Sequence, residues 1–393
     1  MLGLYIHVPF CASLCPYCTF TRGPFDEALA ARYVDAVVSE IEAAPSAGDG
    51  SCDPTVRPQA DTVYFGGGTP SLLTPEAVAR ILDACRRRFA VDPAAEITLE
   101  GNPESVTPSR LAGYRAAGVN RLSLGIQSFR DAELGRLGRV HDARQAYRAV
   151  AESREAGFNN LSLDLMLWLP GQTLSDLAES VEALVAAGPE HASLYLLELY
   201  PSSPFGQAAA EAGWHRAPDD EAADMYLFAM ARLESAGFQQ YEISNLTRPG
   251  RESRHNLKYW TGGDWIGFGP AAHSTWGGHR WNNVGGTEEY LARVFRGTAA
   301  HEGRRALGPQ EQLEEALFMG LRLARGVDLA WIRRRFGVDV WAEYGYRLSP
   351  CFDAGLLASE TGRLRLTREG MLLANEVMRV FVEAPRTKPW LIT

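Results

Sequence analysis

The sequence has no long apolar run and no excess of positive charge. None of its stretches reaches the roughly 18 consecutive apolar residues that cross a membrane. Its start, MLGLYIHVPF, lacks the charged segment and cleavage site of a signal peptide, so we expect a cytoplasmic protein. Lys and Arg number 39 against 48 Asp and Glu, for a net charge of −9. This balance argues against a nucleic-acid partner, because nucleic-acid binders usually present a basic face.

Cysteine is also scarce, and half of it is concentrated in one place. Cys11, Cys15 and Cys18 lie within eight residues, in HVPFCASLCPYCTF. Disulfides are rare in the cytosol, where clustered cysteines more often hold a metal or do chemistry. The remaining cysteines are scattered and do not extend this group; they are Cys52, Cys85 and Cys351.

The cysteine spacing admits three interpretations. A Cys-x3-Cys-x2-Cys loop wraps three thiolates around three corners of a [4Fe–4S] cluster, leaving the fourth iron open to another ligand. A zinc site would need a fourth nearby ligand, for which His7 is the only candidate. A redox dithiol, as CPYC is in glutaredoxin-type enzymes, would not need Cys11, and 393 residues far exceed one domain of about 100. The cluster is the favoured interpretation.

A repeated strand–helix unit organises the first half of the chain. Short β-rich runs are expected as strands at 4–8, 62–66, 96–100, 121–126, 161–167 and 192–199. Helix-period segments lie between them at 26–44, 75–90, 108–118, 143–157 and 174–188. This alternation implies parallel strands joined by right-handed crossovers. Six units without a clear seventh or eighth predict an α/β partial barrel, not a closed eight-fold one.

Polar or glycine residues follow the predicted strands at the ends where such folds place their working groups. The first strand runs into the three cysteines, and the second ends in FGGGTP. The next three strands reach Glu100, Gln127 and Asp164. Each of these alone reads as a turn former or a helix cap. Five consecutive strand ends of this kind favour a ligand site along that edge.

These motifs resemble a known superfamily. CASLCPYC together with GGGTP resembles the radical S-adenosylmethionine (SAM) superfamily, whose partial barrel agrees with the strand–helix pattern. Longer stretches, including ITLEGNPESV, AGVNRLSLGIQSF and HNLKYWTGGDWIGFGPAAHS, resemble the oxygen-independent coproporphyrinogen III oxidase-like family over essentially the whole chain. The resemblance implies a (β/α)6 radical SAM barrel in 1–200, a strand and loop extension with a heme segment in 201–303, and a small winged-helix-like domain in 304–393.

The resemblance also implies a set of site residues. Three cysteines would ligate the [4Fe–4S] cluster, and the SAM pocket would be lined by a tyrosine, a glycine-rich turn, two carboxylates, a glutamine and an arginine. A carboxylate suits the ribose hydroxyls, an arginine suits the methionine carboxylate, and glycine lets the backbone approach closely. The implied ligands are Cys11, Cys15 and Cys18 for the cluster and Tyr5, Gly67, Gly68, Thr69, Glu100, Gln127, Arg139 and Asp164 for SAM.

One position departs from the family pattern. The family usually has glycine before LPGQT, whereas this chain has Trp168. A large side chain at a strand end is expected to crowd or reshape the substrate cavity.

Two features separate the heme chaperones of this family from its oxidases. The oxidases carry a fourth cysteine just after the third, whereas Thr19 and Phe20 follow Cys18 here. They also carry an N-terminal extension, whereas only Met1 to Gly3 precede the first strand of this chain. Both features favour the chaperones.

The stretch HNLKYW, residues 255 to 260, matches one that is associated with heme in the chaperones. His255 is therefore a candidate axial ligand of heme iron, with Tyr259 and Trp260 as flat apolar surface for the macrocycle. The alternative is a histidine packed at the junction of a loop and a strand.

The sequence thus predicts a [4Fe–4S]- and SAM-binding heme chaperone that delivers heme to respiratory acceptor proteins at the membrane surface, as a monomer or dimer. The alternative is a radical SAM enzyme acting on a tetrapyrrole, such as a coproporphyrinogen III oxidase, or a related methyltransferase. The two differ in whether SAM is cleaved to produce a radical, which the sequence does not decide.

Overall fold

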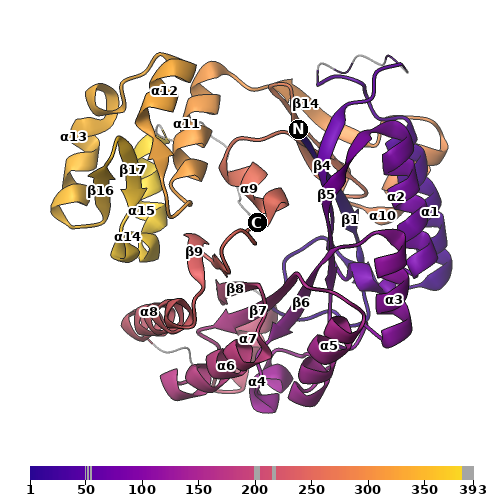
Figure 1. The fold of residues 1–393 in the computed structure, drawn as a ribbon, viewed down its shortest axis with the longest axis horizontal. Helices are drawn as coiled ribbons and strands as arrows, with labels where there is room; N and C mark the ends of the chain where they lie inside the picture. The colour runs from indigo at the N-terminus through magenta and orange to yellow at the C-terminus, as the bar shows by residue number, and fades with distance from the viewer. Residues whose placement is uncertain (49, 51–52, 54, 199–203, 215–217, 383–393) are drawn as a thin grey trace.

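The computed structural model describes residues 1–393 except 49, 51–52, 54, 199–203, 215–217 and 383–393. A curved sheet lies inside a layer of helices, and a smaller C-terminal unit lies to its side (Figure 1). Cys52 is outside the described residues.

The six predicted strands are confirmed and form one parallel array. Neighbouring strands pair in the order β1-β4-β5-β6-β7-β8, each running parallel to the next. Their carboxyl ends therefore meet at one edge, which we call the rim. The strands are β1 (Leu2–Val8), β4 (Gln59–Gly67), β5 (Ala90–Gly101), β6 (Arg121–Gln127), β7 (Leu161–Leu167) and β8 (His191–Leu196).

The helices between these strands cover the outer face of the sheet (Figure 1). Their ends follow local chemistry: Thr173 caps α6 in a reciprocal box with Asp176, and Gly188 ends that helix in a left-handed conformation. The five predicted helices are confirmed. They are α1 (Glu27–Glu42), α2 (Pro75–Arg88), α3 (Pro108–Ala117), α5 (Ala143–Glu155) and α6 (Leu174–Ala187). Further helices are η1 (Pro70–Leu72), α4 (Asp131–Arg136), α7 (Pro204–Glu211) and α8 (Asp219–Ser235).

The described sheet extends beyond the six predicted strands on both sides. Next to β1 it continues with a seventh parallel strand, β11, and then with antiparallel strands, while β10 and β9 add to β8. The strand pattern did not predict β11, because its four residues are too few to show a period. The added elements are β9 (Gln239–Glu242), β10 (Asn245–Thr247), α9 (Arg254–Trp260), β11 (Trp265–Phe268), β12 (His273–Trp276), β13 (His279–Asn283), α10 (Thr287–Phe295) and β14 (His301–Ala306).

The C-terminal part of the chain has its own small sheet and its own hydrophobic core. The sheet has the order β15-β17-β16, and the core runs from Leu313 to Phe381. This agrees with the predicted helices and short hairpin, while the domain limits at residues 200 and 303 stay predictions. The elements are α11 (Pro309–Gly320), β15 (Val327–Asp328), α12 (Leu329–Phe336), α13 (Val340–Asp353), β16 (Leu357–Glu360), β17 (Arg363–Leu366), α14 (Arg368–Leu372), α15 (Ala374–Met378) and η2 (Arg379–Phe381).

Within the described residues, every helix is too short or too polar to span a bilayer.

Candidate functional site

The loop after β1 carries the three clustered cysteines at the rim. Cys11 ends the short strand β2 (Phe10–Cys11), which pairs with β3 (Gly23–Pro24), and it is only 8% exposed. Burial raises the pKa of the Cys11 thiol, although a hydrogen bond from Thr69 opposes this shift. Cys15 and Cys18 are half-buried, and the Cys18 amide donates to the Cys15 carbonyl at 3.2 Å.

A chain of hydrogen bonds ties this loop to two other strand ends. The Thr69 hydroxyl, after β4, donates to Cys11 Sγ at 3.6 Å. Asn102, after β5, donates through Nδ2 to Thr69 Oγ1 at 3.2 Å and accepts through Oδ1 from Arg139 Nη2 at 2.7 Å. Arg139 Nη1 then donates to Cys15 Sγ at 3.7 Å. Two sulfur atoms therefore receive hydrogen bonds, which stabilises thiolates at these positions.

The glycine turn at the end of β4 leaves no room for side chains. Gly67 has φ +109°, and a Cβ there would lie 2.8 Å from the His7 ring. A Cβ at Gly68 would lie 2.5 Å from the Phe10 carbonyl oxygen. The turn is held close because the Gly68 and Thr69 amides donate to the carbonyls of Val8 and Phe10. This close approach requires glycine.

Two carboxylates interact electrostatically, Glu100 at the end of β5 and Asp164 in β7. Tyr64 donates its hydroxyl to Glu100 Oε1 at 2.6 Å, and Asp164 accepts from Ser123 at 3.4 Å. Burial raises the pKa of Glu100 to about 7; the hydrogen bond from Tyr64 opposes this shift, and the charge of Asp164 adds to it. Burial likewise raises the pKa of Asp164.

If Glu100 binds the ribose of SAM as predicted, its raised pKa means that SAM should bind more tightly at higher pH. At a pH below its pKa of about 7 the Glu100 carboxyl is protonated, so it loses the charge and the acceptor capacity that the ribose hydroxyls need. If only the ionised form binds, SAM affinity should rise by about tenfold between pH 6 and pH 8. Equilibrium binding at both pH values tests this, and Glu100→Gln should remove that part of the pH dependence. Equal pH dependence in wild type and Glu100→Gln would contradict it.

Tyr5 lies on β1 beside this carboxylate pair. Its hydroxyl is 3.2 Å from His7 Nδ1, and its ring stacks on Tyr64 with centroids 6.2 Å apart. His7 Nε2 is in turn 2.9 Å from the carbonyl oxygen of Thr21. Both ring nitrogens of His7 are thus engaged, so this histidine is not free to serve as the fourth ligand of a zinc ion.

Gln127 and Trp168 end neighbouring strands in left-handed backbone conformations, with φ of 68° and 62°. Such a conformation costs a non-glycine residue about 1–2 kcal/mol and often marks a functional site. At Trp168 the conformation is one that favours glycine, the residue that the resemblance led us to expect there. Gln127 lies close to Arg139, because a Cβ built on Gly125 would lie within 4 Å of both side chains.

The arrangement fits a [4Fe–4S] cluster and SAM. Each of the three thiolates binds a different iron in such a cluster, so they need not converge on one point. Within the described residues no three His, Cys, Asp or Glu side chains do converge on one metal position. Arg139 Nε is buried without a hydrogen-bond partner, which leaves a donor for an anionic group such as the methionine carboxylate of SAM.

The predicted heme residues lie together on α9, but His255 is enclosed. It is 1% exposed, and its ring nitrogens lie 2.8 Å from Thr62 Oγ1 and 2.9 Å from Tyr259 Oη. Burial, with the charge of Lys258, lowers the pKa of His255 to about 3, so the ring is neutral. In this conformation neither nitrogen is free for iron. His255 is packed, as in the alternative considered above, but in helix α9 and not at the junction of a loop and a strand.

His255 also lies against the residues predicted to bind SAM. Its ring stacks on Tyr64, with centroids 5.1 Å apart, and Tyr64 donates to Glu100. Trp260, at the other end of α9, has the Arg322 guanidinium 4.4 Å above its ring and a buried Nε1 without a hydrogen-bond partner. A variant of His255 is therefore expected to disturb Tyr64 and Glu100 as well.

Asn102 is the site residue that the strand-end pattern missed. It joins Thr69 to Arg139, two groups 70 residues apart in the chain. The signal was present in the E-x-N-P stretch, because Asn102 follows Glu100 by two residues at the same strand end. Only the hydrogen bonds reveal that its side chain faces the cysteine loop.

Comparisons with known proteins show the family of this chain. Residues 5–184 match the model of the Radical SAM superfamily, and residues 307–373 match that of the HemN C-terminal domain. The heme chaperone HemW of Bacillus subtilis is 34% identical, over 97% of this chain and 99% of its own length. The heme chaperone HemW of Mycobacterium tuberculosis is 40% identical, over 97% of this chain and 94% of its own length.

A solved structure shows the same fold. Coproporphyrinogen III oxidase (HemN) from Escherichia coli, a radical SAM enzyme, aligns with a TM-score of 0.81 at 23% identity. The alignment covers 97% of this chain and 89% of that chain.

Proposed function

This chain belongs to the family of the heme chaperone HemW within the radical SAM superfamily, and we propose that it binds heme and delivers it to acceptor hemoproteins. The observation that carries the proposal is similarity to those chaperones over nearly the full length of both chains. The absence of a fourth cysteine after Cys18, where Thr19 and Phe20 stand, supports it over the oxidase alternative.

In this proposal Cys11, Cys15 and Cys18 hold a [4Fe–4S] cluster next to a SAM pocket. When bound, such a cluster supplies an electron and an open iron position to which SAM attaches. Arg139 supports this role through two features, since it donates to Cys15 Sγ and keeps Nε unpartnered for the methionine carboxylate. The closely held turn at Gly67 and Gly68 allows the backbone to approach the ligand.

The lower part of the pocket would hold the nucleoside of SAM. Glu100 and Asp164 offer carboxylate oxygens to the ribose hydroxyls, and Tyr64 orients Glu100 by its hydrogen bond. Tyr5 packs beside this pair on β1, where it helps to exclude water. Gln127, at the end of β6, is the last of the residues proposed to line the SAM pocket.

We further propose that the protein works in the cytoplasm and delivers heme to respiratory hemoproteins at the membrane surface. The heme contacts are proposed on α9, where Trp260 offers an aromatic surface. His255 can ligate iron only after exchanging one of its two hydrogen bonds, to Thr62 or to Tyr259.

Heme titration of cluster-loaded protein, followed by absorbance, tests this proposal. We expect wild type to bind heme with a shifted Soret band. Trp260→Ala should bind more weakly with the same band position, because it removes apolar contact area but no iron ligand. An altered band in His255→Ala would identify the axial ligand, and an unaltered one would leave His255 in a packing role.

Two results would contradict the proposal. Wild type that binds no heme would remove the chaperone function. Formation of protoporphyrinogen at useful turnover, from coproporphyrinogen III with SAM and reductant, would move the radical enzyme ahead.

A further inference from the structure

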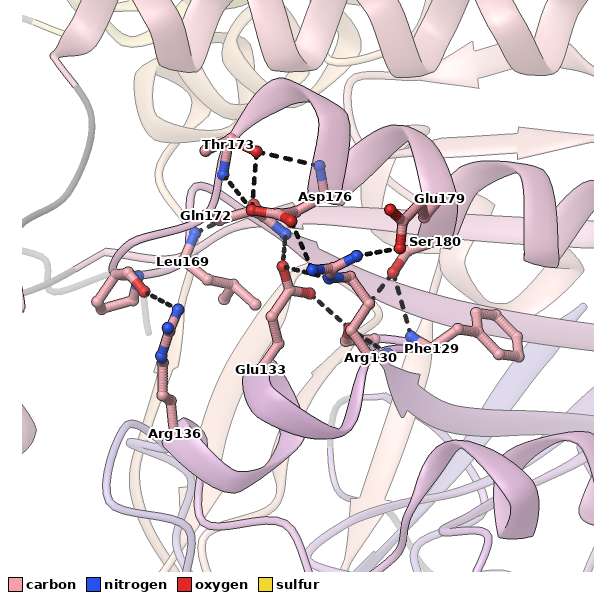
Figure 2. A network of polar contacts seen from close by, with 12 residues as sticks. Phe129, Arg130, Glu133, Arg136, Leu169, Gln172, Thr173, Asp176, Glu179 and Ser180 are labelled. Atoms are coloured by element: carbon pink, nitrogen blue, oxygen red, sulfur yellow. Dashed lines mark hydrogen bonds and ion pairs between the residues drawn. The ribbon is translucent and has the colours of Figure 1, made fainter.

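A buried network joins the two loops that follow β6 and β7 (Figure 2). Its centre is Glu133, on the short helix α4, whose side chain points toward the loop that precedes α6. Glu133 is only 2% exposed. It accepts from Ser128 Oγ at 2.5 Å and from Gln172 Nε2 at 3.2 Å. Burial raises the pKa of Glu133, and these two hydrogen bonds partly offset the shift.

Gln172 fixes the loop on the β7 side. The side-chain Oε1 of Gln172 accepts from the backbone amide of Leu169 at 3.2 Å, and the backbone amide of Gln172 donates to the Leu169 carbonyl at 3.0 Å. This closes a tight turn directly after Trp168, the residue with left-handed backbone at the end of β7. Arg136 also donates to the Pro170 carbonyl at 2.9 Å. The Glu133–Gln172 hydrogen bond therefore anchors the end of the strand that carries Asp164.

Glu133 fixes the loop on the β6 side as well. The backbone carbonyl of Glu133 accepts from the Leu137 amide, and the Arg139 backbone amide donates to the Leu134 carbonyl at 2.9 Å. Helix α4 thus leads without a break in hydrogen bonding into Arg139, which reaches Cys15 and Asn102. Ser128, the other donor to Glu133, directly follows Gln127. The Glu133 carboxylate therefore bonds the residue after Gln127 and the loop after the strand of Asp164, while backbone hydrogen bonds connect its helix to Arg139.

The ion pairs of Arg130, at the outer part of the network, stabilise the two loops less than the hydrogen bonds of Glu133 do. Arg130 pairs with Asp176 at 2.6 Å and with Glu179, and its Nε lies 3.9 Å from Glu133 (Figure 2). The Arg130 and Glu179 side chains are partly exposed, and ion pairs of this kind are worth little because water screens them. The buried hydrogen bonds to Glu133 are worth more, because an unpaired buried carboxylate carries a large desolvation cost.

We propose that Glu133 is a positioning residue for SAM binding, acting through the Glu133–Gln172 hydrogen bond on the loops that carry Gln127, Arg139 and Asp164. The inference rests on the SAM pocket of the proposed function, since it assigns no contact between Glu133 and SAM. A small displacement of either loop shifts the guanidinium and the carboxylate relative to each other, which weakens a ligand that uses both.

A reciprocal exchange tests the proposal. Glu133→Gln removes the charge and leaves one acceptor oxygen for two donors, the Ser128 hydroxyl and the Gln172 side-chain amide, so one of these two hydrogen bonds loses its acceptor. Its Kd for SAM should rise about five- to tenfold, the scale of one lost hydrogen bond. The double variant Glu133→Gln/Gln172→Glu restores an amide–carboxylate pair in the opposite orientation, so its Kd should return to within about twofold of wild type. The measurement is equilibrium dialysis of labelled SAM at matched cluster content, with the EPR spectrum of the SAM-saturated reduced cluster as second readout.

A matched control separates positioning from general loss of stability. Glu40, on α1, is also a buried carboxylate, which accepts from Tyr290 at 2.6 Å, Asn283 at 2.6 Å and the Gly269 amide at 2.9 Å, and none of these partners belongs to the proposed SAM pocket. Glu40→Gln should lower the thermal midpoint while leaving the Kd for SAM unchanged. Should Glu133→Gln fail to fold, Ser128→Ala removes one donor to Glu133 and should raise the Kd severalfold.

The outcomes are distinct. Glu133→Gln with wild-type affinity and spectrum, or an exchange variant that regains its thermal midpoint but not its Kd, would overturn the proposal. Wild type that binds SAM but not heme would overturn the proposed function and leave this inference standing. Wild type that does not bind SAM would overturn both.

Discussion

Replacement of Cys11, Cys15 or Cys18 by alanine should each abolish the visible absorption of the reconstituted protein and remove most of its iron. Three cysteine ligands hold a [4Fe–4S] cluster in the proposed site, so loss of one leaves two of its irons without a protein ligand. Cys11→Ala and Cys15→Ala should additionally leave the hydrogen-bond donors of Thr69 and Arg139 without their sulfur acceptors. The measurement is the absorbance spectrum together with iron analysis after anaerobic reconstitution.

The other cysteines provide the controls for this prediction. Cys85 is fully buried in α2, so Cys85→Ala should lower stability by removing packing but retain the cluster. Cys351, on α13, is partly buried against the C-terminal core, and Cys351→Ala should also retain the cluster. Cys52→Ala is expected to behave likewise. A full cluster in any of the three ligand variants would refute the assignment.

Glu100→Ala and Asp164→Ala should each weaken SAM binding by about 1–3 kcal/mol, the scale for losing a hydrogen bond to a charged group. That is about five- to 150-fold in Kd. Glu100→Ala has a further effect, because it leaves the Tyr64 hydroxyl, buried beside His255, without its acceptor. Asp164→Ala frees Ser123 and Ser162, which donate to it. Calorimetric titration with SAM at matched cluster content measures both.

Cluster content is the internal control for these two variants. Neither carboxylate hydrogen-bonds to the cysteine loop, which is tied to the rim by Thr69, Asn102 and Arg139 instead. Both variants should therefore retain the iron and absorption of wild type. Unchanged SAM affinity in both would show that SAM binds at another face of the fold.

Local patterns were sufficient to predict the six strands and the five helices between them. Each strand is an apolar run long enough to be buried on both faces, and each helix shows a 3.6-residue period. The gathering of the strand ends was also predictable, because parallel strands bring their carboxyl ends to one edge. By contrast, β11 (Trp265–Phe268) is a parallel strand without a local signal, and pairing with β1 stabilises it.

His255 illustrates where residue type ceases to be informative. A histidine followed by Tyr259 and Trp260 has the composition of a heme site, and the same three residues are equally suited to packing. The choice depends on Thr62, 193 residues earlier, which faces one ring nitrogen, and on Tyr259, which faces the other. Burial then lowers the pKa of His255 to about 3, although nothing in HNLKYW indicates that the ring is enclosed.

The sequence by itself determined the ligand spacing and the turn that receives it. Cys11, Cys15 and Cys18 lie within one loop, so their separation is set by the chain, and Gly68 is required because a Cβ would meet the Phe10 carbonyl. Only the tertiary structure decided how that loop joins the rim and what holds the rim in place. The Asn102–Arg139 and Glu133–Gln172 hydrogen bonds span 37 and 39 residues. Such contacts depend on strand register and on the course of two loops at once, whereas local sequence patterns specify each element separately.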